Sequence, residues 1–150
     1  MPMKETDATY FTKFRGDYGE AIAAKHLKKK GFRILAQNLR IARYEIDILA
    51  EDREYLVFAE VKARTVPHLL PDGSSPFSIT PAMAVTKTKQ RNLVSAARMY
   101  LASHENDKMI RFDVIEVYLK ETTRWGRPAF DVLKVHHIEN AFDATSSASH

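Results

Sequence analysis

The sequence predicts an α/β domain in which a mixed central β-sheet is flanked by helices, with the element order α-β-β-β-α-β-β. Two segments, 17–30 and 80–103, carry apolar residues at helical spacing. Five shorter segments have the apolar pattern and length of strands. The chain has 150 residues and no internal repeat, which fits one domain.

The first predicted helix covers residues 17–30. Asp17 and Glu20 have the spacing of a capping box, and Gly31 is placed to end the helix. Its apolar stripe consists of Ala23, Ala24 and Leu27. When the stripe is extended backward by the helical repeat, it reaches Glu20. We therefore expect a carboxylate on the face that meets the sheet, although a capping residue is the alternative interpretation of Glu20.

Three strands are expected next, at residues 32–37, 43–50 and 55–64. The second and third form a hairpin around Asp52 and Arg53, with a loop of two or four residues. Opposed residue numbers then sum to 105, as for positions 51 and 54, so that Glu45 lies opposite Glu60 and Asp47 opposite Phe58. A three-residue loop would reverse the parity and move Asp47 to the other face of the sheet.

The second half begins with a long loop, residues 65–81, which is rich in Pro, Gly and Ser and is expected to be mobile or functional. Thr80 and Pro81 fit the N-cap and first turn of a second helix that runs to about Ser103. Its predicted buried face comprises Gln90, Leu93, Val94, Ala97, Tyr100 and Leu101.

The last two strands are predicted at 110–120 and 129–136, with a turn between them at 121–128. The expected organisation is an irregular N-terminal arm at 1–15, a domain at 16–140, and a disordered polar tail at 141–150.

Composition narrows the class of protein. The net charge of +4 and the pI near 9.3 mildly favour a polyanionic partner. The absence of cysteine excludes disulfides, zinc–cysteine sites and thiol catalysis. No apolar run approaches a membrane span and the N-terminus lacks a signal-peptide pattern, so we expect a soluble cytoplasmic protein without a membrane partner.

One face of the predicted hairpin concentrates charge, because Glu45, Asp47, Glu60 and Lys62 all point to it. The neighbouring apolar residues indicate that both strands are buried, where idle charge is rare. Clustered carboxylates repel one another unless a cation lies among them, and Mg²⁺ prefers such oxygen ligands. The sequence therefore predicts a metal site, with a solvated face of cross-strand ion pairs as the alternative.

These residues carry a family resemblance. An acidic residue on an N-terminal helix, an Asp on one strand and Glu-x-Lys on the next resemble the PD-(D/E)XK nuclease superfamily. More narrowly, the chain resembles the YraN-like family of predicted endonucleases, itself similar to Holliday junction resolvases. The matching segments are GDYGEAIAAKHLKKKGFRILAQNLR, EIDILAED, VFAEVKAR and IRFDVIEV, within residues 16 to 118.

The resemblance implies a restriction-endonuclease-like core and a magnesium-dependent endodeoxyribonuclease, with Mn²⁺ as a substitute ion. By position, Asp47 and Glu60 would hold the metal, Lys62 would be the active-site lysine, and Glu20 would complete the acidic set. The carbonyl of Val61 is a further ligand in such sites. The substrate would be DNA, including branched DNA in repair or recombination, and two cuts at a junction would call for a symmetric homodimer.

Nucleic-acid contacts are expected outside the metal site as well. The basic residues assigned to phosphates are Arg64, Lys87, Lys89 and Arg91. Tyr44 stands where the family usually has Gly, so a binding module with weak or no cleavage is the alternative function. A protein-interaction adaptor on the same scaffold is the third hypothesis.

Two other features have a less definite interpretation. His136 and His137 are adjacent on a strand, face opposite sides of the sheet and cannot share one ion. Trp125, between Arg124 and Arg127 in the last turn, fits either packing or a base-stacking platform.

Overall fold

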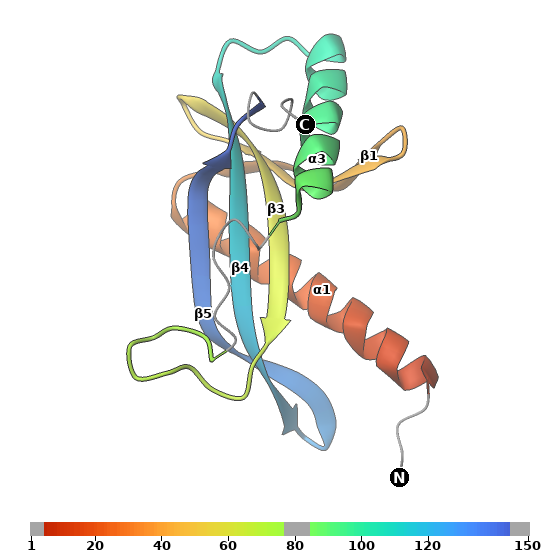
Figure 1. Cartoon of the computed structure of the whole chain (residues 1–150), viewed down its shortest axis with the longest axis vertical. Coiled ribbons are helices and arrows are strands. Elements are labelled where there is room, and N and C mark those ends of the chain that lie inside the picture. The colour runs from red at the N-terminus through yellow and green to blue at the C-terminus, as the bar shows by residue number, and fades with distance from the viewer. Residues whose placement is uncertain (1–4, 77–84, 145–150) are drawn as a thin grey trace.

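The computed structural model describes residues 5–76 and 85–144, with side chains from Thr12 onward. Its elements are α1 (Glu5–Lys29), β1 (Arg33–Ile41), β2 (Tyr44–Glu51), β3 (Tyr55–Thr65), α3 (Lys87–Ser103), β4 (Met109–Arg124) and β5 (Arg127–Phe142). The strands form one sheet in the order β1-β2-β3-β4-β5, in which only the β3–β4 pair is parallel (Figure 1). The predicted α/β class, mixed sheet and element order are confirmed.

The two helices cover opposite faces of the sheet. α1 packs the predicted stripe of Ala23, Ala24 and Leu27 against one face, in a cluster that includes residues of β2, β3 and β4. α3 packs Leu93, Val94 and Ala97 against the other face, around Phe58. Both buried stripes are those that the sequence pattern predicts. Burying them removes apolar surface from water on each side of the sheet, which stabilises the packing of the helices.

α1 begins at Glu5, so the predicted irregular arm at 1–15 is wrong from Glu5 onward. Asp17 lies inside the helix and cannot form the predicted capping box with Glu20. The rings of Phe14 and Tyr18 lie 5.1 and 5.7 Å from the ring of Phe130 in β5. This aromatic contact extends the packed part of the helix toward its N-terminus, and local sequence gives no sign of a partner so far along the chain.

The β2–β3 hairpin has the predicted parity but not the predicted register. Opposed residue numbers sum to 107, as in the pair Ile48 and Ala59, rather than to 105. The loop is set by Asp52, whose N–H donates to the carbonyl of Tyr55 at 3.0 Å and whose carboxylate accepts N–H bonds from Glu54 and Tyr55. Because the shift is two residues, the paired residues of Ile48–Glu51 and Leu56–Ala59 keep their predicted faces.

α3 begins at Lys87, and Thr86 is its N-cap, with Oγ1 accepting the N–H of Lys89 at 3.2 Å. The predicted cap at Thr80 and Pro81 lies outside the described residues, and the helix they were expected to open starts later than predicted. Residues 66–76 contain no helix or strand, in agreement with a loop, and its expected mobility stays a prediction.

The last two strands are longer than predicted. β4 and β5 continue to Arg124 and Arg127, so the expected turn at 121–128 shrinks to Trp125 and Gly126. At the other end β5 reaches Phe142, whose ring stacks on Phe112 at 5.3 Å. The predicted disordered tail at 141–150 is therefore wrong for residues 141 and 142, and residues 145–150 lie outside the described residues. Within the described ranges, neither helix is long and apolar enough to cross a membrane.

Candidate active site

The candidate site lies where β2 separates from β3. Their ladder ends at the pair Ile48 and Ala59, and Asp47 comes next. The N–H of Val61 donates to Asp47 Oδ2 at 2.9 Å, so the carboxylate takes the place of a backbone acceptor. In an extended strand the N–H and C=O of one residue face the same edge. The carbonyl of Val61 is thus directed toward the side of Asp47, which suits its predicted role as a ligand.

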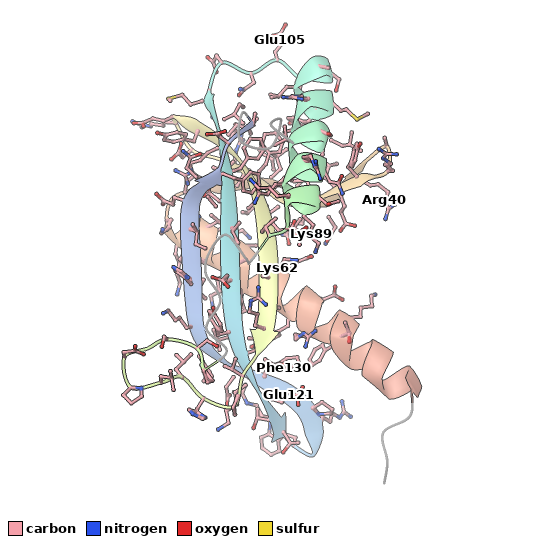
Figure 2. All side chains as sticks on the ribbon, in the orientation of Figure 1. Arg40, Lys62, Lys89, Glu105, Glu121 and Phe130 are labelled. Carbon is pink, nitrogen blue, oxygen red and sulfur yellow. The ribbon has the colours of Figure 1, made fainter. Side chains whose placement is uncertain are left out.

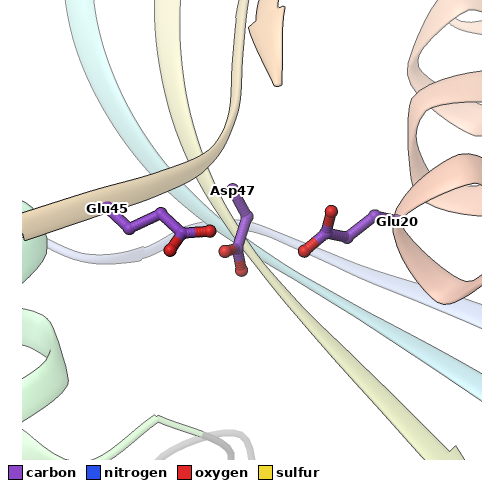
Figure 3. Close-up of side chains that lie close together, drawn as sticks. All are labelled: Glu20, Glu45 and Asp47. Atoms are coloured by element: carbon purple, nitrogen blue, oxygen red, sulfur yellow. The ribbon is translucent and has the colours of Figure 1, made fainter. Parts of the chain in front are cut away.

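Three carboxylates converge at this point. Oxygens of Glu20 from α1 and of Glu45 and Asp47 from β2 all lie within 4.8 Å of one another. Figure 3 shows the carboxylate of Asp47 between the other two. Hard oxygen donors from three side chains fit a Mg²⁺ or Mn²⁺ ion. The prediction that Glu20 faces the sheet beside Asp47 agrees with this arrangement.

Gly19 lets α1 approach the sheet closely enough to deliver Glu20. A Cβ at this position would lie 2.6 Å from the Cβ of Ala63 in β3, a separation that real side chains do not reach. Two small residues therefore bring the helix and the strand together, and the next residue of the helix, Glu20, enters the site.

Asp47 has an unusual affinity for its proton. Burial raises its pKa from 3.8 to about 7, and the nearby carboxylates of Glu60 and Glu20 add to the increase. The bond from Val61 N–H opposes it, because this bond stabilises the ionised form. Burial also raises the pKa of Glu20, an effect that a hydrogen bond from Asn38 partly offsets. In both groups burial is the largest cause of the shift, and neighbouring carboxylates act in the same direction.

Glu60 and Lys62 share one face of β3, as predicted, and this is the face on which α3 packs. The Nζ of Lys62 lies 3.5 Å from Glu60 Oε1, and the Nζ of Lys89 in the first turn of α3 lies 3.8 Å from the same oxygen. Figure 2 shows where these two lysines lie on β3 and α3. Glu60 is thus held toward two lysines, while Glu45 joins Glu20 and Asp47. Burial lowers the pKa of Lys62, and the neighbouring Lys89 lowers it further.

A cavity of about 230 Å³ opens at these groups. Its lining consists of Arg43, Tyr44, Glu45, Asp47, Glu60, Lys89, Asn92 and Leu93. It is open to solvent between β2 and the start of α3, so a ligand can reach the carboxylates and a lysine together.

Glu45 has its cationic partner on the neighbouring strand β1. Its Oε2 lies 3.8 Å from Arg40 Nη2. Arg40 is opposite Glu45 in the β1–β2 ladder, a pairing that only the sheet register reveals. Arg43 lies over the ring of Tyr44, with Cζ 5.1 Å from the ring centre.

The predicted phosphate-binding residues do not all lie at the site. Lys89 lines the cavity, whereas Lys87 and Arg91 are exposed on α3. Arg64 is two residues beyond Lys62 on the same face of β3, and its Nε lies 3.3 Å from Glu116 Oε2.

Glu116 was not singled out in the sequence. Its side chain is only 2% exposed and is bound by Arg64, by the hydroxyl of Tyr118 at 3.1 Å and by Nδ1 of His136 at 3.2 Å. The β3–β4 register places it beside Lys62. The one available signal was an acidic residue inside the apolar run IRFDVIEV.

The two adjacent histidines do face opposite sides of the sheet. His136 contacts Glu116, while His137 Nε2 lies 2.6 Å from Oδ2 of the buried Asp113 and its Nδ1 lies 3.2 Å from Nε2 of His26 in α1. Burial would raise the pKa of Asp113, but bonds to His137 and Arg111 outweigh it and hold this pKa below its usual value. His137 therefore ties α1 to the sheet.

Comparison with known proteins places this sequence in a family. The pattern of the uncharacterised protein family UPF0102 matches residues 19–117, a span that begins beside Glu20 and ends just after Glu116. The chain belongs to this family. It is the YraN-like group that the four sequence segments predicted.

Relatives in the UPF0102 family align over most of their length. A UPF0102 protein of Chlorobaculum tepidum is 48% identical over 128 residues, which are 85% of this chain and 90% of that protein. One from Caldanaerobacter subterraneus is 41% identical over 129 residues, which are 85% of this chain and 93% of that protein. Their names state no activity.

Proposed function

We propose that this UPF0102 protein is a metal-dependent endonuclease that acts on DNA. One observation carries the proposal: carboxylates from α1 and β2 meet at the end of the β2–β3 ladder, next to a lysine pair. The raised pKa of Asp47 supports it, because burial and the neighbouring carboxylates both disfavour the ionised form. A divalent cation bound there would offset both effects.

The residues divide the chemistry of phosphodiester hydrolysis among them. Asp47, Glu60 and Glu20 would hold the ion, with Glu45 beside them and the Val61 carbonyl as a further ligand. The ion, when bound, would supply an activated water and stabilise the charge of the transition state and leaving group. Glu60 would exchange its lysine contacts for the metal.

Lys62 would act on the phosphate itself. It lies on the same strand face as Glu60, and its lowered pKa has burial as the main cause. A lysine with a lowered pKa can orient and help deprotonate the attacking water, while a protonated one stabilises the charge of the transition state. Lys89, which lines the cavity and lies beside Lys62 at the same Glu60 oxygen, would contact a neighbouring phosphate.

The choice of DNA rests on charge and on the resemblance to junction resolvases. Lys62, Lys89 and Arg64 form a cationic row around the carboxylates, and the whole chain has a net charge of +4. Branched DNA is the substrate class that the resemblance favours, and a homodimer would make its two cuts. Sedimentation with and without a four-way junction tests the dimer.

Cleavage assays test the enzyme. The purified chain should cut single-stranded, duplex, flap or four-way-junction DNA with Mg²⁺ or Mn²⁺, but not with EDTA. Asp47→Ala and Lys62→Ala should each abolish the cut. Glu105→Ala is the matched control, because it removes an exposed carboxylate beyond the far end of α3 (Figure 2). No cutting under any of these conditions, or full cutting by Lys62→Ala, would refute the proposal.

A binding module without cleavage is the second candidate, and one observation favours it. Tyr44 lines the cavity at the position where the family usually has Gly, so its side chain takes up space there that Gly would leave free. Salt-dependent DNA binding that survives Asp47→Ala, in a protein that never cuts, would identify this function. Tyr44→Gly would then be expected to restore cleavage.

A further inference from the structure

The last two strands form a ribbon that leaves the sheet. β3 ends at Thr65, which is paired with Leu119, but β4 and β5 stay paired to Arg124 and Arg127. In Figure 1 this β4–β5 ribbon, residues 120–131, projects beyond the arrowhead of β3. β3 does not extend alongside this ribbon, so the tip of the ribbon points away from the core.

Trp125 occupies the tip and is 99% exposed. It is the only tryptophan of the chain. Full exposure excludes the packing role that the sequence left open. A tryptophan buries more apolar surface than any other side chain, so leaving it in water forgoes that stabilisation.

The backbone at the tip also disfavours this residue. Trp125 has φ 56° and Gly126 has φ 73°, so the two form a turn with both central residues in the left-handed region. Asn-Gly is the usual pair for such hairpin turns, and a bulky residue there is strained. Neither local conformation nor packing accounts for Trp125, which indicates a contact outside the chain.

The surroundings of Trp125 favour a nucleic acid as that contact. Arg124 and Arg127 flank the turn, and Lys120 is exposed further down the ribbon. Arg124 also bridges to Asp131 across the ribbon, which fixes its position at the tip. An aromatic ring between guanidinium groups combines a platform for base stacking with contacts for phosphates.

The distance between the tip and the candidate active site is close to one turn of duplex DNA. Five residues separate Glu60 from Thr65 along β3, and six more separate its partner Leu119 from Trp125 along β4. At about 3.3 Å per residue, the tip lies roughly 35 Å from Glu60 along the strands. One turn of duplex DNA is about 34–36 Å, so both can face the same side of one duplex.

We infer that the β4–β5 ribbon holds the DNA substrate about one helical turn from the cleaved bond, with Trp125 stacked on a base that is unpaired there. This inference rests on the proposed function and specifies its substrate. A paired base shows no free face inside a duplex, so stacking at a narrow tip selects DNA with a fork, a flap or an unpaired end.

The single tryptophan makes the test direct. Its fluorescence is recorded in EDTA, which prevents cutting, while the full chain is titrated with forked DNA or with a relaxed, covalently closed circular duplex, which has neither ends nor unpaired bases. Forked DNA should quench and shift the emission, and the closed duplex should not. Trp125→Asn should weaken binding to the fork by roughly 5- to 150-fold, the loss of one base stack, with little change for the duplex.

Asn suits the turn, so the variant should fold, and circular dichroism checks this. Equal emission changes with both DNAs, or unchanged affinity of Trp125→Asn for the fork, would overturn the inference. The inference would also be overturned if Trp125→Asn sedimented with half the mass of the natural protein and bound DNA with unchanged affinity. That result would show that the tip joins two copies of the chain. A fork-specific signal without any cutting in Mg²⁺ would keep the inference and refute the nuclease.

Discussion

Replacing Asp47 with Asn should stabilise the metal-free protein while destroying its activity. Ionisation of Asp47 is disfavoured in the folded chain, where its pKa is raised from 3.8 to about 7. At 1.36 kcal/mol for each tenfold change, this difference corresponds to about 4 kcal/mol against the ionised form. Because Glu60 and Glu20 can move apart or attract counter-ions, we expect about 2 kcal/mol of stabilisation in Asp47→Asn at pH 8.

The pH dependence follows from the direction of the shift. The folded state holds the Asp47 proton more tightly than the unfolded state, so this group lowers stability as pH rises from about 4 to about 7. The Asp47→Asn variant has no such ionisation, so its stability does not fall for this reason as pH rises. Urea unfolding in EDTA should therefore show nearly equal stability of the two proteins at pH 4, and the full difference at pH 8.

Two controls accompany this experiment: the addition of Mg²⁺, and a variant of a second carboxylate outside the site. Mg²⁺ at 100 times its Kd should stabilise the natural chain by about 2.7 kcal/mol, and Asp47→Asn by much less. Asp52→Asn changes a carboxylate that accepts two N–H bonds in the β2–β3 turn, so it should not stabilise the chain. Equal stability of Asp47→Asn and the natural chain at pH 8 would refute the account of the site.

Three further predictions concern the neighbours of this site. Lys62→Ala should lower kcat on DNA by at least about 100-fold while binding in EDTA is retained, as measured by single-turnover cleavage and fluorescence anisotropy. Gly19→Ala should cost about 1–3 kcal/mol in urea unfolding and reduce cleavage, and Ala63→Gly in the same chain should restore both; no rescue would mean that the close approach is unimportant. Glu116→Gln should loosen Arg64 and flatten the salt dependence of DNA binding, and an unchanged salt slope would show that Glu116 only supports the core.

The fold class was accessible from the sequence because it depends on periodicity. The helical stripes around Leu27 and Leu93 and the apolar runs of β3 and β4 specify which faces are buried, and burial determines how helices and sheet form layers. The ends of elements were less accessible. α1 reaches back to Glu5, and its side chain Phe14 packs on Phe130, which lies more than a hundred residues away in the chain.

Part of the site was also accessible from sequence. Residue types and an even-numbered loop were sufficient to place Asp47, Glu60 and Lys62 on one face, because a two-residue change of register does not alter the face. The same pattern could not show that Glu60 turns toward Lys89, or that Glu45 groups with Glu20. Those contacts depend on where α3 and α1 cross the sheet.

The sequence by itself determined the layers, the charged face of the hairpin and membership of the family, since each of these depends on local pattern. Only the tertiary structure decided which carboxylates meet, because Gly19 and Ala63 set the approach of α1. It also decided that Trp125 is exposed at the end of a free ribbon, since exposure depends on which strands lack a neighbour. Contacts between distant segments follow from packing, which local periodicity does not encode.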